Sequence, residues 1–146
     1  MITRSLRIQI PIWLQIWLYT ALLIHMFGGI TKLYFIGIGY DHLTHALSAS
    51  VIAAIGYLLF TSIDRYSESI HFPRRFLSTL VLFFVMASGM VWEMMEFAVD
   101  LTFHIEMQGS IDDTVMDMIF NLMGGGIVAI AHFAHQVLDT KETKDK

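Results

Sequence analysis

The sequence contains no cysteine among its 146 residues. This absence excludes disulfides, thiolate metal sites and cysteine nucleophiles. Charge is also scarce, because Asp, Glu, Lys and Arg make up 15% of the chain, against about 25% in an ordinary soluble domain. The longest gap between its apolar stretches is residues 64–75, which is too short to form a soluble domain of its own.

Apolar residues dominate the remainder, at 55% of the chain with a mean hydropathy of +0.61. They form four stretches that approach or exceed the ~20 residues a helix needs to cross a bilayer. These are Ile8 to Thr31, His42 to Ile63, Phe76 to Phe103 and Thr114 to Leu138. We predict an all-α, four-transmembrane-helix bundle that forms one integral membrane domain over residues 1–146, with a polar tail at 139–146. The first stretch exceeds the ~7–15 apolar residues of a signal peptide and is interpreted as a retained helix.

Positive charge is distributed unevenly between the predicted loops. Of the nine Lys and Arg residues, only Lys32 falls on one side of the predicted bundle. Because short loops rich in Lys and Arg stay cytoplasmic, we predict that both termini are cytoplasmic. We expect a multi-pass protein of the cell (plasma) membrane, with the lipid bilayer as its surroundings and no nucleic-acid partner.

The opposite side of the predicted bundle carries a slice of acidic and imidazole side chains. Carboxylates within apolar helices are costly and usually mark a functional site. The members of the slice are Asp41, His42, His45, Glu93, Glu96, Asp100, His104, Glu106, Asp112, Asp113 and Asp117.

Spacings of three and four residues place many of these groups on shared helix faces. Carboxylate oxygens and imidazole nitrogens together suit a divalent ion, and zinc, manganese and iron are the favoured ones. The predicted metal ligands are Asp41, His45, Glu93, Glu96, Asp100, Asp113 and Asp117. Glu93 and His42 are the predicted catalytic residues, each a candidate general base. The Glu-x-x-His pairs of ferritin-like di-iron proteins are absent, so a di-iron oxidase is not predicted.

Structural roles stay open for several of these residues. Asp112 and Asp113 also suit the N-terminal cap of the last helix, where anions are favoured. Glu93 could hold the bundle together, either protonated or paired with a histidine. His25, on the first predicted helix, is either a further ligand or a hydrogen-bonded core histidine.

Three motifs give the chain a family resemblance: residues 40–45 (YDHLTH), 92–97 (WEMMEF) and 108–118 (QGSIDDTVMDM). In this order they resemble the YjdF-like family of small membrane proteins. The run of Asp113, Asp117, Asn121 and Gly124 is also similar, more distantly, to the VanZ-like proteins. The resemblance implies that Asp41, His45, Glu93, Glu96, Asp113 and Asp117 form one site, and it implies no particular reaction.

Three functions are compatible with these observations. The first is a metal-dependent enzyme acting on a lipid-like substrate, since a bound divalent ion polarises substrates and activates water. The second is a non-catalytic small subunit of a larger membrane complex, with membrane-protein partners or further copies of the chain. The third is a component of ion or proton transport, because intramembrane carboxylates also mark ion paths.

Overall fold

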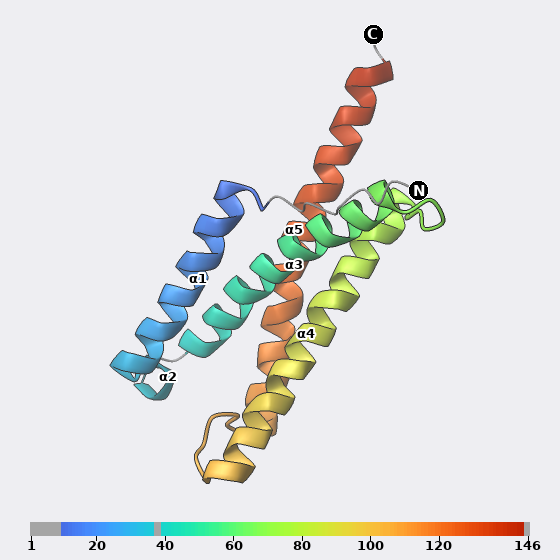
Figure 1. The fold of residues 1–146 in the computed structure, drawn as a ribbon. Coiled ribbons are helices and arrows are strands. Elements are labelled where there is room, and N and C mark those ends of the chain that lie inside the picture. The colour runs from blue at the N-terminus through green and yellow to red at the C-terminus, as the bar shows by residue number, and fades with distance from the viewer. Residues whose placement is uncertain (1–9, 37–38, 145–146) are drawn as a thin grey trace.

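The computed structural model describes residues 10–36 and 39–144. It consists of α1 (Ile12–Thr31), α2 (Leu33–Ile36), α3 (Tyr40–Tyr66), α4 (Arg74–Phe103) and α5 (Ile111–Lys144), and no strand occurs within the described residues (Figure 1). Four of these helices are long and apolar enough to span a membrane, over residues 12–31, 40–66, 76–103 and 111–135. The all-α prediction with four spans is therefore confirmed, whereas the cytoplasmic placement of the termini stays a prediction.

Helix boundaries differ from the predicted ones mainly at acidic N-termini. The second span begins at Tyr40 and so includes Asp41, and the last begins at Ile111 and so includes Asp112 and Asp113 in its first turn. Carboxylates are favourable at the positive end of the helix dipole, which explains why polar residues are part of these helices.

Three smaller differences concern the ends of the predicted segments. The short helix α2 lies inside a segment expected to be a loop, and α5 continues as helix through most of the predicted tail, to residue 144. Residues 8 and 9 of the first predicted span, like Arg4 and Arg7, lie outside the described residues.

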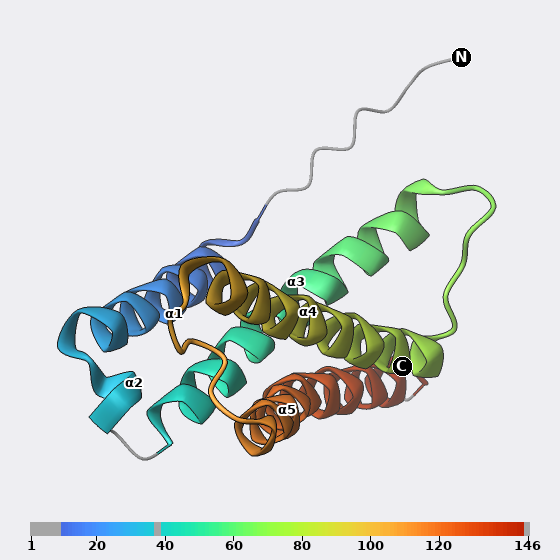
Figure 2. The same cartoon turned by 90° about the horizontal axis from the view of Figure 1, so that it is seen from below.

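Helix α3 is the centre of the bundle. It packs against α1, α4 and α5, most extensively against α5 (Figures 1 and 2). Within the described residues no Cα atom of α1 lies within 8 Å of one in α4 or α5, and α1 reaches α4 through the rings of His25 and Trp92. One buried apolar cluster joins α3 to α4 through Ala53, Val81 and Val85, and another joins α3 to α1 through Leu14 and Val51. Helix α1 is therefore attached to the bundle mainly through α3.

The contact between α3 and α5 depends on a glycine. A Cβ added at Gly124 would overlap the backbone oxygen of Ala46, so the two backbones touch at this point. Small residues allow this close approach between helices in membranes. Asp117 lies seven residues before Gly124, about two turns along the same helix, and the crossing brings it against α3.

The loop between α4 and α5 is fixed by Asp100. Its two carboxylate oxygens accept hydrogen bonds from the backbone N–H groups of Met107 and Gln108, at 2.7 and 2.9 Å. Gly109 has a φ of +69°, and a Cβ there would lie 2.5 Å from Oδ2 of Asp113. This conformation and close contact explain the glycine, and the loop holds the first turn of α5 next to the end of α4.

Candidate functional site

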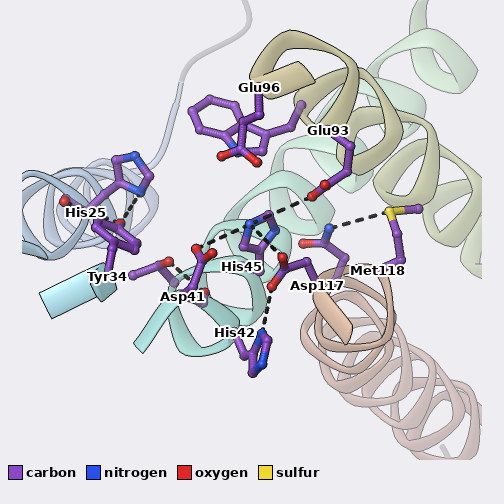
Figure 3. A network of polar contacts seen from close by, with 12 residues as sticks. His25, Tyr34, Asp41, His42, His45, Glu93, Glu96, Asp117 and Met118 are labelled. Carbon is purple, nitrogen blue, oxygen red and sulfur yellow. Dashed lines mark hydrogen bonds and ion pairs between the residues drawn. The ribbon is translucent and has the colours of Figure 1, made fainter. Parts of the chain in front are cut away.

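Three carboxylates from three helices surround the imidazole of His45 (Figure 3). Its Nε2 atom lies 3.6 Å from Oδ1 of Asp41, 4.0 Å from Oε1 of Glu93 and 3.9 Å from Oδ2 of Asp117. Asp41 precedes His45 by one helical turn on α3, whereas Glu93 comes from α4 and Asp117 from α5. The prediction that separate helices bring these groups together therefore holds for these four residues.

The centre of this group is buried. His45, Glu93 and Asp117 are 7%, 2% and 1% exposed, and neither carboxylate oxygen of Glu93 has a hydrogen-bond partner. The side chain of Thr114 lies near Glu93 but makes no hydrogen bond of normal geometry with it. A buried carboxylate without a partner is costly, so Glu93 needs a cation, a proton or a further donor.

Asp117 divides its two oxygens between two histidines. Oδ2 faces His45, whereas Oδ1 is 2.8 Å from Nδ1 of His42. The His42 ring also stacks on Phe120, with the ring centroids 5.1 Å apart. A carboxylate beside Nδ1 favours the tautomer that carries its proton there and leaves Nε2 as the acceptor. The His42 side chain is 21% exposed, so the pair reaches the edge of the buried group.

Negative charge exceeds positive charge in this region. Its five carboxylates outnumber its two imidazoles, so three negative charges would stay uncompensated with every carboxylate ionised and both imidazoles protonated. The ion pairs of these carboxylates within the described residues involve only histidine. The five carboxylates and two imidazoles counted here belong to Asp41, His42, His45, Glu93, Glu96, Asp113 and Asp117.

The spacing of the donor atoms suits a bound ion. Separations of 3.6–4.0 Å around Nε2 of His45 exceed ordinary hydrogen-bond lengths. They are comparable with the roughly 3–4 Å between neighbouring ligands that each lie ~2.0–2.2 Å from one ion. Two sets of three residues have ligand atoms that lie within 4.8 Å of one another. They are Asp41, His45 and Asp117, and His42, Asp113 and Asp117.

The comparisons with known proteins agree with this description of a helical membrane protein. A family model described as "Predicted membrane protein (DUF2238)" matches residues 1–137. The chain belongs to the DUF2238 family. No curated protein and no solved structure matches it. YjdF-like remains a suitable name for a member of this family, whereas the VanZ-like resemblance finds no support in the comparisons.

Two predicted ligands of the DUF2238 protein have other partners. Asp100 binds the loop backbone and belongs to neither set of three residues. Glu96 accepts a hydrogen bond of 2.8 Å from Nε1 of Trp92, one turn earlier on α4. Among the remaining acidic and imidazole residues of the slice, His104, Glu106 and Asp112 are exposed and also lie outside both sets.

Three aromatic residues that were not predicted as site residues, Tyr34, Tyr40 and Trp92, connect α1 and α2 to this region. Tyr34 Oη and Nδ1 of His25 are 2.7 Å apart, and Tyr40 donates to the carbonyl of Ile24 at 2.5 Å. Burial raises the pKa of the Tyr34 phenol, which keeps it protonated as a donor. The His25 ring also meets Trp92 edge-on, with centroids 5.6 Å apart. His25 thus fits the alternative of a hydrogen-bonded core histidine. For Trp92, the position directly before Glu93 in the sequence was a signal that it lies near the site.

Proposed function

We propose that the DUF2238 protein binds a divalent metal ion within the membrane and is a metal-dependent enzyme acting on a lipid-like substrate. The proposed ligands are Asp41, His45, Glu93 and Asp117. One observation carries the proposal: Glu93, which belongs to neither set of three residues, places a buried carboxylate without hydrogen bonds 4.0 Å from Nε2 of His45, beside the set of Asp41, His45 and Asp117. Zinc, manganese and iron are the favoured ions, because the donors are carboxylate oxygens and one imidazole nitrogen.

Charge supports a cation at this position more strongly than it supports a purely structural role. A structural group of this kind would be expected to pair its acids with hydrogen-bond donors, yet Glu93 has no such partner in the described residues. A divalent ion would offset two of the three surplus negative charges that full ionisation of the five carboxylates would leave. A bound ion of this type supplies Lewis acidity and lowers the pKa of coordinated water.

His42 is the proposed general base. Its Nδ1 is held by Asp117 at 2.8 Å, so Nε2 is available to accept a proton, as in other carboxylate–histidine pairs. Phe120 fixes the plane of the ring by stacking. In this proposal Asp117 has two roles, as a metal ligand through Oδ2 and as the residue that orients His42 through Oδ1. Glu93 is assigned to the ion and no longer to proton transfer.

The interior beyond the site favours an enzyme over a transport component. Between the site and the far end of the bundle, α3 and α4 bury apolar side chains that include Ala53, Val81 and Val85. Apart from the hydroxyl of Tyr57, which donates to Ser78, such a cluster offers no ligands to a moving ion. It supports a site that is reached from one side, near Asp41 and His42, whose side chains are 26% and 21% exposed.

Elemental analysis of the purified protein in nanodiscs tests the metal. After loading with zinc, manganese or ferrous iron and removal of excess, we expect about one ion per chain in the wild type. Asp117→Asn and Glu93→Gln should lose most of it. Glu106→Gln, which removes an exposed carboxylate from the loop after α4, is the matched control and should retain it. The proposal is overturned if the loaded wild type holds no stoichiometric ion, or if Asp117→Asn binds as much as the wild type.

A further inference from the structure

A crevice between α1 and α4 runs alongside the proposed site. It has a volume of about 250 Å³ and is bounded by α1, α3 and α4, with Asn121 of α5. Thr44, His45 and Trp92 line one end, and Leu18, Ile52 and Ile55 line the other. His45 is therefore a wall shared by the crevice and the group of carboxylates.

The crevice faces the hydrocarbon region of the bilayer. Within the described residues the Cα atoms of α1 and α4 stay more than 8 Å apart, with the rings of His25 and Trp92 in contact at one end of the crevice. All of its lining residues lie in the membrane-spanning segments. His45 and Ile55 are ten residues apart on α3, which corresponds to ~15 Å along the helix. This is about half of the ~30 Å hydrocarbon core, and so about the depth of one leaflet.

The polarity of the lining changes along this length. Near His45 the walls offer hydroxyl, imidazole and indole groups, whereas near Ile55 they are apolar. The polarity of a membrane lipid decreases in the same way, from its polar ester groups to the apolar end of its acyl chain. A transmembrane helix of a partner does not fit, because ~15 Å of a helix ~10 Å in diameter occupies roughly 1,200 Å³.

We infer that this crevice holds an acyl chain of a lipid from the leaflet at the end of the bundle where α3 and α5 begin, with the ester end of the lipid beside His45. The inference names the substrate class of the proposed metal site and in this sense rests on the proposed function. Lipid occupancy of the crevice, however, is measurable without metal or activity.

Photo-cross-linking in nanodiscs tests the inference. The probe is phosphatidylglycerol with a diazirine on one acyl chain, and labelled residues are located by mass spectrometry. Ser48 and Ile52 serve as reporters, because they lie on the central helix and line the crevice. We expect label at both in the wild type and its loss in Leu22→Trp, which enlarges a side chain of the crevice wall. Leu23→Trp, at an exposed neighbour outside the lining, is the matched control and should keep the label.

Metal content measured on the same samples separates the two proposals. Leu22→Trp should bind metal like the wild type, and this result would also show that the variant folds. Asp117→Asn should lose metal but keep the label at Ser48 and Ile52. The inference is overturned if the wild type shows no label at these reporters or if Leu22→Trp is labelled equally. Label at the reporters in a wild type that binds no metal would support the crevice and refute the metal site.

Discussion

The substitution Glu93→Gln is expected to raise stability without metal and to reduce the stabilisation that metal provides. Glutamine keeps the shape of the side chain, removes its charge and supplies N–H donors near the carboxylates of Asp117 and Asp41. In the metal-free protein, the wild type carries a carboxylate that is 2% exposed and has no hydrogen-bond partner. An unsatisfied buried group of this kind costs about 1–3 kcal/mol. At about 2–4 °C per kcal/mol for a chain of this size, the variant should unfold some 2–12 °C higher than the wild type in the presence of a chelator.

Metal should change the comparison. At a free ion concentration of 100 times Kd, the wild type gains about 2.7 kcal/mol. Loss of a ligand should weaken binding at least as much as loss of an outer-shell partner, which is about tenfold to hundredfold. The variant then gains only about 0.4–1.4 kcal/mol at the same ion concentration. The metal-induced rise in Tm should therefore be clearly smaller in Glu93→Gln than in the wild type.

Thermal unfolding in nanodiscs or mild detergent, followed with chelator and with a buffered series of ion concentrations, measures both effects. Glu96→Gln is the control, because it removes a carboxylate from the same helix that already has Trp92 as a partner. It should show no stabilisation in chelator and a metal response like that of the wild type. The reasoning is refuted if Glu93→Gln lowers Tm in chelator, or if metal raises the Tm of the variant and the wild type equally.

Further predictions concern the loop, the helix crossing and the topology. Asp100→Ala removes the acceptor of two backbone hydrogen bonds and should lower the free energy of unfolding by about 1–3 kcal/mol per bond to the charged group. Its metal content should be unchanged, and a loss of metal would instead assign Asp100 to the site. Gly124→Ala should destabilise by at least about 1–3 kcal/mol because its Cβ meets a backbone oxygen, whereas Gly126→Ala, where a Cβ meets nothing within 4 Å, should be near neutral in thermal unfolding. Because the chain has no cysteine, single substitutions report sidedness. A membrane-impermeant maleimide added to whole cells should label Glu106→Cys and not Ser69→Cys, and the reverse pattern would invert the predicted topology.

The sequence alone was sufficient for the four spans, and it also named the four residues that the structure brings together around His45. In lipid every backbone N–H and C=O must be satisfied within the segment, so long apolar stretches can hardly be anything but helices. Spacings of three and four residues then assign side chains to faces, which is enough to group Asp41 with His45 on one helix and Glu93 with Glu96 on another. The second and fourth spans begin earlier than predicted, at Tyr40 and Ile111. Acidic residues at these positions resemble a loop in the sequence, although the helix dipole favours them at a helix N-terminus.

Contacts between helices decided the rest, because a helical period fixes the face of a residue but not its depth relative to a neighbouring helix. The direct contact of Gly124 with Ala46 sets how far α5 is shifted along α3, and this shift places Asp117 between His42 and His45. Asp100 lies on the same predicted stripe as Glu93, yet it is close enough to the end of α4 to bind the loop backbone instead. The crevice between α1 and α4 is likewise a product of tertiary structure, since it depends on the separation of two helix backbones. No pattern within a single segment predicts that separation.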